Sequence, residues 1–396
     1  MDFDLPPEIQ ELQAKVRDFV RRELIPIEMT INHFERVEPD ILRPFQEKVK
    51  ALGLWQVDVP KEFGGLGLSQ VAKCVIEEEV SQSKAMPYRL SALMGPPVGP
   101  ILYRCNDEQK ERFLKPVLRG EKRICFAQTE PDAGSDPAGM RTRAVRDGDH
   151  YVITGTKRFI TGSIDADAAQ VICVTDPEKG ANGGISCVVV DMKAPGVKLV
   201  KAWQNMMDDP VGEIVFDGAR VPIADRIGEE GEGFRLAQEW LTRARIKQAA
   251  KALGIAQRCY DMSIDYAEAR TTGGIPLGER QAVQLMIADC AMEIRSLRLM
   301  IYDTAWRADQ KQDIRNEAYM VKIMGLETVT RVIDRAIEIH GALGLSKKLP
   351  LEYWYRQVRS SRIADGATEV LRWVLARNLA RARKPRPPKA KPNEAA

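Results

Sequence analysis

The spacing of hydrophobic residues changes twice along this 396-residue chain, and these changes restrict the folds open to it. Residues 1–122 carry apolar side chains at helical spacing, as in the stripe over residues 8–24. Residues 123–230 instead show short β-branched runs bounded by turn dipeptides, for example at residues 185–190. Helical spacing returns in residues 231–380, in stretches long enough for a bundle. The sequence therefore predicts a mostly α-helical α+β protein with a β domain between two helical domains.

The last residues, 381–396, differ in composition from the rest of the chain. They contain six Lys or Arg, one Glu and four prolines, which gives this segment a charge of +5, whereas the whole chain has +3. Because proline interrupts helices, we expect a basic, disordered tail here. The alternative is a contact with nucleic acid or a membrane surface. The remainder of the chain carries −2 and so offers phosphates no general attraction.

Cysteine and histidine usage limits the chemistry. The seven cysteines are scattered and form no C-x-x-C pair, so they predict neither a disulfide framework nor a zinc site and fit a reducing cytoplasm. The three histidines, His33, His150 and His340, lie too far apart in the sequence for a histidine-rich metal centre. No G-x-S-x-G motif accompanies them. We therefore expect carboxylates to carry any acid–base chemistry, and we expect no metal.

Two short blocks combine turn residues with hydroxyls and an aromatic. Residues 126–136 read Phe-Ala-Gln-Thr-Glu-Pro-Asp-Ala-Gly-Ser-Asp, which predicts a strand ending in a tight turn with exposed backbone N–H groups. Residues 155–162 read Gly-Thr-Lys-Arg-Phe-Ile-Thr-Gly and present Phe159 and Thr161 on a strand. Backbone donors beside an aromatic suit a flat heteroaromatic cofactor. Each block taken alone is equally compatible with an ordinary hairpin.

These two blocks, at this spacing, resemble the flavin-binding middle domain of the acyl-CoA dehydrogenase family. Further segments agree with the family in the same order, namely residues 106–110, 216–222, 228–234, 254–257 and 340–344. The resemblance extends over about residues 5–380. It implies an N-terminal helical domain, a middle β-barrel or sandwich and a C-terminal four-helix bundle. It also implies bound FAD and a homotetramer.

The resemblance assigns roles to particular residues. In the family, the first block meets the flavin ring, the next turn reaches the flavin phosphates or the CoA arm, and the second block flanks the ring. The matching positions are Phe126, Gln128, Thr129, Gly134, Ser135, Phe159 and Thr161, with Ser135 also implied as a substrate contact. A neighbouring subunit holds the ADP half of FAD, through positions that match Arg270, Gln281 and the segment from Glu338 through Gly341. Arg245 matches an arginine near the CoA moiety, and a guanidinium pairs well with phosphate.

The sequence departs from the family pattern at the catalytic base. Common members carry Glu followed by Gly-Thr, whereas this chain has Asp365, Gly366 and Ala367. Asp is one methylene shorter, but a subgroup of the family resembles this chain here. Asp365 is therefore implied as the base and as a substrate contact, with Glu369 in reserve. The alternative is that Asp365 only caps a helix.

Three other positions also differ from the family. Gly273 stands where many members have Phe, and Glu338 where many have Gln. One branch carries its catalytic Glu at the position of Ala244, so that alternative base is absent here. A carboxylate at position 338 is unfavourable near a pyrophosphate unless it faces a ribose hydroxyl.

The implied function is FAD-dependent α,β-dehydrogenation of an acyl-CoA thioester to the enoyl-CoA, within fatty acid metabolism, with electrons passed to an electron-transfer flavoprotein. A flavin oxidase or monooxygenase on the same fold is the first alternative, and a flavin-bearing nucleic-acid-binding protein is the second. The N-terminus lacks the basic and apolar regions of a signal peptide, and no apolar run reaches the ~20 residues of a membrane span. We therefore expect a cytoplasmic protein without a membrane partner.

Overall fold

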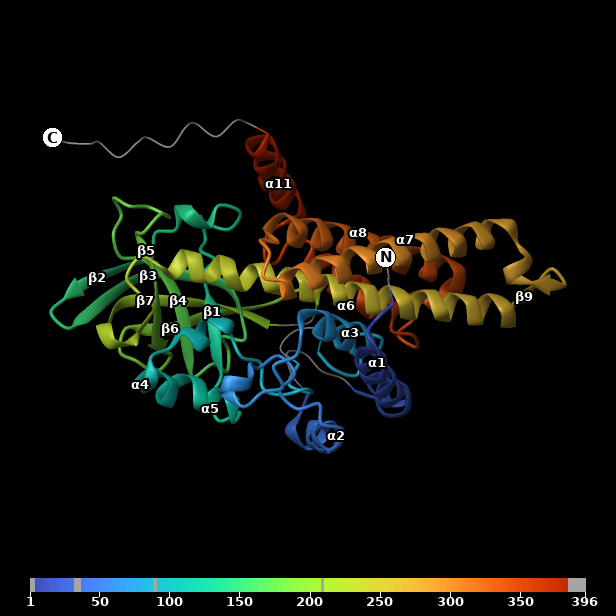
Figure 1. The fold of residues 1–396 in the computed structure, drawn as a ribbon, viewed down its shortest axis with the longest axis horizontal. Coiled ribbons are helices and arrows are strands. Elements are labelled where there is room, and N and C mark those ends of the chain that lie inside the picture. Colours follow the sequence, from blue (N-terminus) through green and yellow to red (C-terminus); the bar gives the residue numbers. More distant parts are fainter. Residues whose placement is uncertain (1–3, 32–36, 88–90, 208–209, 384–396) are drawn as a thin grey trace.

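The computed structural model describes residues 4–31, 37–87, 91–207 and 210–383. Figure 1 shows the sheet domain at one end of an elongated molecule. The long C-terminal helices extend from it to the other end, the earlier N-terminal helices lie below them, and the last helices of the N-terminal part lie below the sheet domain. This order of helical, β and helical parts confirms the expected fold class.

The N-terminal domain consists of short helices whose starts follow from the sequence. Helix α1 (Pro7–Phe19) begins with proline in its first turn. Helix α3 (Gln70–Val80) is capped by Ser69, whose Oγ accepts a hydrogen bond from Ala72 N at 3.1 Å. The remaining helices of this domain are α2 (Pro39–Ala51), α4 (Asp107–Gln109) and α5 (Lys115–Leu118).

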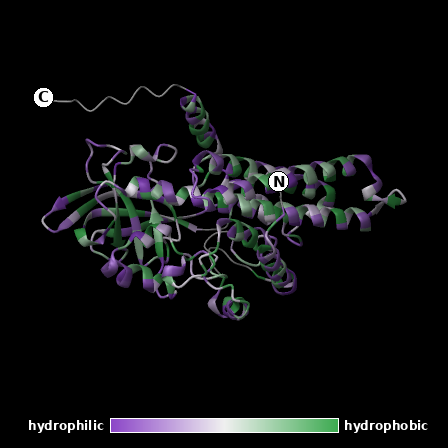
Figure 2. Ribbon diagram, in the orientation of Figure 1, coloured by the Kyte–Doolittle hydropathy of each residue, from purple (hydrophilic) through white to green (hydrophobic). Residues whose placement is uncertain are grey.

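Eight strands of the middle domain form one mixed sheet in the order β6-β7-β3-β2-β4-β5-β8, with β1 parallel to β4. Their bounds are β1 (Ile124–Ala127), β2 (Arg143–Asp147), β3 (His150–Thr161), β4 (Ala168–Val174), β5 (Ile185–Asp191), β6 (Val197–Gln204), β7 (Pro210–Pro222) and β8 (Arg226–Ile227). The strands share one hydrophobic core, to which β3 contributes Tyr151, β5 contributes Val190 and β7 contributes Phe216, although β5 does not pair with β3 or β7. The sheet therefore closes around this core, as a barrel or sandwich does, and its central strands are hydrophobic (Figure 2).

The C-terminal bundle is built on three long helices, α6 (Gly233–Ala269), α7 (Gln281–Asp309) and α8 (Arg315–His340). Shorter elements complete it, namely β9 (Thr271–Thr272), β10 (Ile275–Pro276), α9 (Ala342–Leu345), α10 (Leu351–Ser361) and α11 (Thr368–Ala382). Helix α6 has 37 residues. At a rise of 1.5 Å per residue it is roughly 55 Å long, and it connects the sheet domain to the far end of the bundle (Figure 1).

Glycine allows α6 to approach its neighbours closely. A Cβ added at Gly254 of α6 would lie 2.0 Å from the carbonyl oxygen of Glu78 on α3. A Cβ added at Gly325 of α8 would lie 3.2 Å from Cα of Ala249 on α6. Helix α6 therefore packs against both the N-terminal domain and α8, which fixes the orientation of its side chains toward both.

Some expectations fall at the edge of the described chain. The basic tail expected at residues 381–396 lies outside the described residues from residue 384 onward, while α11 continues to Ala382. His33 also lies outside the described residues. The seven cysteines are all buried and are not joined by disulfides. Across the described ranges, no helix is long and apolar enough to cross a membrane.

Candidate active site

A buried ion pair joins the two sequence blocks. Lys157 on β3 is fully buried, and its ammonium donates to Glu130 Oε1 at 2.7 Å and to the carbonyl of Gln128 at 2.9 Å. The backbone N–H groups of Arg141 and Thr142 donate to the same carboxylate at 2.6 and 3.0 Å. Burial alone would raise the pKa of Glu130, but the Lys157 charge and these hydrogen bonds outweigh it and lower the pKa. The turn after β1 is therefore held against β3 by charge.

Phe159 has a strained backbone close to this pair. Its φ is +57°, a left-handed value that costs a bulky residue on the order of 1–3 kcal/mol. The pairing of β3 with β7 shifts register between Lys157 and Ile160, and this bulge turns the Phe159 ring outward, where the residue is 56% exposed. The ring lies 5.0 Å from that of Trp203 on β6. An exposed aromatic held in this way can stack on a planar ligand.

The first block faces α6. The Phe126 ring packs edge-on against Trp240 of α6, with 4.3 Å between ring centroids. Two residues after Phe126, Gln128 has a buried Oε1 that accepts no hydrogen bond from the described residues. The carbonyl of Thr129 accepts a hydrogen bond from the N–H of Arg158 at 2.8 Å, which brings the two blocks side by side.

The turn after the first block is open to solvent. The N–H of Ala133 donates to the carbonyl of Glu130 at 3.3 Å and closes the turn. Gly134 and Ser135 follow on its exposed side, and a Cβ added at Gly134 would meet no atom within 4 Å. Thr161, the last residue of β3, is only partly buried. These positions are accessible to a ligand.

Helix α10 connects the second block to the segment that carries Asp365. The carbonyl of Met207, just after β6, accepts a hydrogen bond from Gln357 Nε2 at 2.9 Å, and Ser360 Oγ bonds to the Met207 sulfur. Strand β6 also carries Trp203, which contacts Phe159. The loop that follows α10 is thereby fixed relative to the exposed aromatic.

The backbone around Asp365 is held by two buried cations. Asp365 has φ +55° and Gly366 has φ +100°, so the loop is left-handed at both positions. Lys322 of α8, which is fully buried, donates to the carbonyls of Ala364 and Gly366, the latter at 2.5 Å. Arg245 of α6 donates from Nε to the carbonyl of Asp365 at 3.1 Å. Three successive carbonyls are therefore bonded toward the bundle.

The Asp365 side chain bonds to α6 rather than to a helix end. Its Oδ2 accepts a hydrogen bond from Gln248 Nε2. The residue at the N-cap of α11 is Ala367, without a side-chain cap bond, so the alternative in which Asp365 only caps a helix is wrong. Glu369 lies in the first turn of α11, and its side chain is 73% exposed, 3.9 Å from the guanidinium of Arg362. The structure therefore brings Asp365, and not Glu369, to the face of α6.

Arg245 lies beneath the loop rather than at the surface. It is 4% exposed, packs on Tyr319 at 5.1 Å, and burial lowers its pKa. Its side chain supports the Asp365 carbonyl, which the sequence did not indicate, and its contact with CoA stays a prediction. Sequence reasoning also missed Lys322, Gln248 and the place of Trp240 beside Phe126. The one available signal was a lysine inside the apolar stripe of α8.

Four predicted positions lie at the other end of the bundle. Arg270 directly follows α6, Gln281 begins α7, Glu338 lies in the last turn of α8, and Gly341 directly follows that helix with φ +58°. All four are exposed. Trp240 and Ala269, the last residue of α6, are 29 residues apart on this helix, which is roughly 44 Å at 1.5 Å per residue. One chain therefore does not bring these four positions to the blocks around Phe159.

The turn near Arg270 explains the departure at Gly273. Strands β9 and β10 are joined by Gly273 and Gly274, with φ of +58° and +84°. A two-residue hairpin loop with positive φ at both positions, as in a type I′ turn, favours glycine. A Cβ at Gly273 would also lie 2.9 Å from the guanidinium of Arg280.

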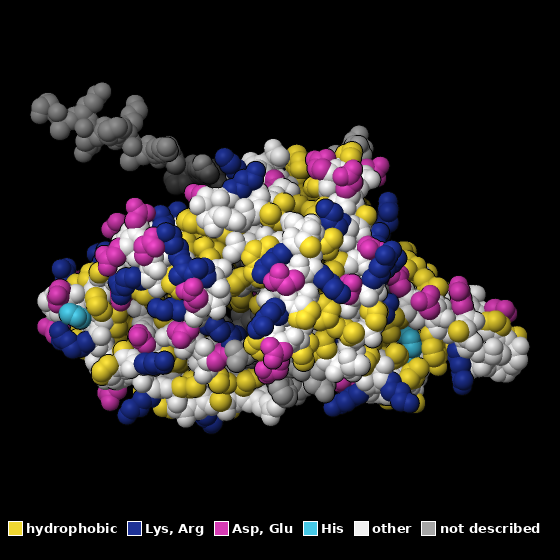
Figure 3. All heavy atoms as spheres, turned by 90° about the horizontal axis from the view of Figure 1, so that it is seen from below, with side chains coloured by type: hydrophobic (Ala, Val, Ile, Leu, Met, Phe, Trp, Pro, Cys, Tyr) yellow, Lys and Arg dark blue, Asp and Glu magenta, His cyan; other side chains and the backbone are white. Residues whose placement is uncertain are grey.

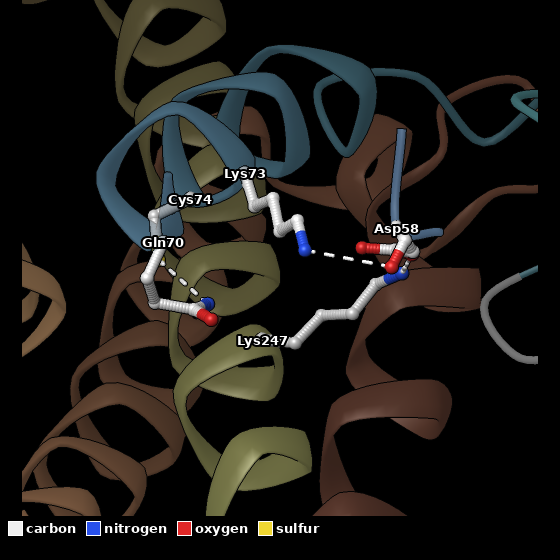
Figure 4. A pocket seen from close by; sticks show the side chains of 5 residues that line it. All are labelled: Asp58, Gln70, Lys73, Cys74 and Lys247. Carbon is white, nitrogen blue, oxygen red and sulfur yellow. Dashed lines mark hydrogen bonds and ion pairs between the residues drawn. The ribbon is translucent and has the colours of Figure 1, made fainter. Parts of the chain in front are cut away.

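A small polar pocket lies between α3 and α6 (Figure 4). Its lining residues are Asp58, Gln70, Lys73, Cys74 and Lys247. Lys247 of α6 forms an ion pair with Asp58 at 2.6 Å, and burial raises the pKa of the Cys74 thiol to about 12. A protonated thiol is a poor nucleophile. The Cys74 thiol is therefore not a candidate nucleophile, and the ion pair of Lys247 with Asp58 attaches α6 to the N-terminal domain.

Most of the chain is similar to known families, relatives and solved structures. Three family models match, described as the acyl-CoA dehydrogenase N-terminal domain (residues 6–121), middle domain (125–219) and C-terminal domain (231–380). The 3-(aryl)acrylate reductase of Clostridium sporogenes is 35% identical, with 94% of this chain and 98% of that protein covered. The human mitochondrial short-chain specific acyl-CoA dehydrogenase is 36% identical, with 96% of this chain and 91% of that protein covered. The butyryl-CoA dehydrogenase structure from Megasphaera elsdenii has a TM-score of 0.82 at 28% identity and covers 96% of this chain and 100% of that one.

Proposed function

The chain belongs to the acyl-CoA dehydrogenase family, an oxidoreductase family acting on CH–CH groups, and we propose that it dehydrogenates an acyl-CoA thioester with Asp365 as the base. One observation carries this proposal. On α6, Trp240 contacts Phe126 of the first block and Gln248 contacts Asp365. Trp240 and Gln248 are separated by about 12 Å along the helix, at 1.5 Å per residue. The carboxylate and the first block thus lie along one stretch of helix.

Each of the residues around Asp365 has a separate role in the proposed reaction. Asp365 takes the α-proton at the carboxylate oxygen that Gln248 leaves free. The backbone N–H of Asp365 makes no hydrogen bond to other described residues, and it is proposed to hold the thioester carbonyl oxygen and so acidify the α-proton. Lys322 and Arg245 keep that N–H in place by binding the carbonyls around it. Bound FAD supplies the acceptor for the hydride that leaves the β-carbon.

The first set of predicted positions fits a flavin. Phe159 offers an exposed ring beside an open turn, and Gln128 offers a buried acceptor that no described residue satisfies. A buried unsatisfied polar atom costs about 1–3 kcal/mol, so a bound donor there would be favourable. We propose that Phe126, Gln128, Thr129, Gly134, Ser135, Phe159 and Thr161 hold the FAD ring and its linker, with Ser135 also near the thioester arm.

The second set of positions supports a homo-oligomer, with a tetramer as the proposed form. Arg270, Gln281, Glu338 and Gly341 can hold the ADP half of FAD only if another copy brings its own Phe159 close. Helix α7 also carries an apolar stripe at seven-residue spacing, formed by Leu285, Met292, Leu299 and Trp306, which are 42–62% exposed. A stripe of this kind is suited to a second copy of the chain.

The finer assignments follow from the family resemblance. We propose a cytoplasmic enzyme of acyl-CoA metabolism, fatty acids included, that passes its electrons to an electron-transfer flavoprotein. Buried cysteines without disulfides suit that compartment. Figure 3 shows acidic and basic side chains interspersed on the face seen from below, where they form no single-sign stripe for nucleic acid.

Anaerobic mixing of the FAD-loaded protein with butyryl-CoA, octanoyl-CoA and phenylpropionyl-CoA tests the proposal. The expected result is loss of flavin absorbance with at least one thioester and formation of the enoyl-CoA. Phenylpropionyl-CoA is included because one relative is named as an aryl acrylate reductase. Rapid oxygen consumption during turnover would support the oxidase or monooxygenase instead. No reaction with any of the three would count against dehydrogenation of these acyl classes.

A further inference from the structure

One face of α6 runs from the first block to Asp365. Trp240, Ala244 and Gln248 are spaced four residues apart, so they project from the same side of the helix. Lys247, one residue before Gln248, instead forms the ion pair with Asp58 that Figure 4 shows. The fixed position of α6 thus directs the Gln248 amide toward the loop.

The contact between Gln248 and Asp365 involves one oxygen only. Gln248 Nε2 donates to Asp365 Oδ2, and no other hydrogen bond reaches this carboxylate from the described chain. Gln248 Oε1 is buried and accepts no hydrogen bond from any described residue. The amide cannot simply turn over, because its oxygen would then face a carboxylate oxygen. The arrangement leaves Oδ1 of Asp365 as the unbonded oxygen.

The loop does not need this bond to keep its backbone conformation. Lys322 and Arg245 already bind the carbonyls of residues 364–366. An Asp side chain, however, retains rotation about χ2 unless something holds one oxygen. The amide bond therefore acts on the orientation of the carboxylate and adds little to the position of the loop.

We propose that Gln248 is a positioning residue for the base: it holds Oδ2 of Asp365 so that Oδ1 faces the α-carbon. The inference rests on the proposed role of Asp365. It also accounts for the short acid, since the Gln248 amide occupies the space that the extra methylene of Glu would need. The left-handed φ of +55° favours Asp over Glu as well.

Proton abstraction can be measured apart from hydride transfer. Methylthioacetyl-CoA has α-hydrogens, but sulfur replaces its β-carbon, so no hydride can leave. In D₂O, the α C–H bond breaks, its electron pair stays on the thioester enolate, the proton passes to Asp365, and a deuteron returns. Mass spectrometry of the recovered thioester gives the exchange rate.

The variant Gln248→Leu should slow this exchange by about 10–100-fold, the usual effect of losing a residue that orients a functional group. Its affinity for methylthioacetyl-CoA should change less than about threefold, since the bond orients the base and does not bind substrate. The matched control is Gln257→Leu, because Gln257 lies on the same helix and donates to the Asp261 carboxylate at 2.8 Å, away from the loop. The control should exchange at the wild-type rate.

A second comparison separates positioning from a general effect on stability. Asp365→Glu alone should be slow, whereas Asp365→Glu with Gln248→Ala should be at least ~10-fold faster, because removing the amide makes room for the longer acid. Wild-type exchange in Gln248→Leu, or a double variant no faster than Asp365→Glu, would overturn the inference. Wild-type exchange in Asp365→Asn would instead refute the base itself, and so the two failures are distinguishable.

Discussion

Replacing Lys157 by Met should expose the energetic role of the buried pair in the middle domain. Lys157 is 0% exposed and Glu130 is 7% exposed, so the variant leaves a buried carboxylate with backbone N–H donors but no counter-charge. Losing one partner of a buried pair costs about 3–5 kcal/mol. Those donors remain in the variant, and Met fills much of the lysine volume. We therefore expect the free energy of unfolding to fall by about 3 kcal/mol near neutral pH.

The loss should depend on pH. The folded state holds the pKa of Glu130 below its ordinary value of 4.5, so the pair contributes stability above about pH 4.5 and loses it as the pH falls through the folded pKa. In Lys157→Met the buried carboxylate has lost its counter-charge. As the pH falls, protonation of Glu130 removes the free-energy cost of this unpaired charge in the variant. The difference between wild type and variant should therefore shrink from about pH 7 to about pH 4.

Urea unfolding of the FAD-free protein, followed by tryptophan fluorescence, measures this difference. The double variant Glu130→Gln with Lys157→Met removes both charges and should recover most of the lost stability, since a neutral pair has no uncompensated charge. If Lys157→Met unfolds within about 0.5 kcal/mol of wild type, the usual range for a surface substitution, the buried pair does not have this energetic role. A difference that is the same at both pH values would refute this role equally.

Three further substitutions have expected outcomes. Gln170 is fully buried, and neither amide atom meets a hydrogen-bond partner among the described residues, so Gln170→Met should raise the free energy of unfolding by about 1–2 kcal/mol in the same urea assay; no gain would show that the amide is satisfied. Phe159→Gly should relieve the left-handed strain and stabilise the FAD-free protein by about 1 kcal/mol, yet weaken FAD binding at least ~10-fold in a fluorescence titration; unchanged affinity would contradict the stacking role. Leu285→Glu with Met292→Glu should reduce the mass seen by sedimentation and release FAD, and an unchanged mass would exclude α7 as the interface.

The sequence predicted the parts of the fold that local patterns determine. Helical and β spacing predicted the order of helical, β and helical parts that the structure has. The bulge that exposes Phe159 could not be read in the same way. Strand alternation places Tyr151, Ile153, Lys157 and Phe159 on one face, but the register shift after Lys157 turns Phe159 outward. That shift depends on pairing with β7, more than fifty residues away.

For the candidate site, the family motif supplied the residues but not the contacts that hold them. Asp365 came from its place in the loop, whereas its bond to Gln248 depends on the packing of α6 across a separation of 117 residues. The buried Lys322 likewise follows from the position of α8, since a lysine in an apolar stripe shows only that a partner is needed, not which one. For Arg245 the family match indicated a contact with CoA, whereas its hydrogen bond to the Asp365 carbonyl beneath the loop had no signal in the sequence.

Substitution of Asp365 by Asn is the most direct test of the proposed dehydrogenation. Asn keeps the shape of the side chain and tolerates the left-handed φ of +55°, but it cannot accept the α-proton. With the thioester that reduces the wild-type flavin fastest, we expect anaerobic flavin reduction slower by at least ~10³-fold, within the range for loss of a general base, while FAD and acyl-CoA still bind. Glu369→Gln, the control on α11, should have little effect. Near-normal reduction in Asp365→Asn, with acyl-CoA and FAD bound as in the wild type, would contradict the proposal.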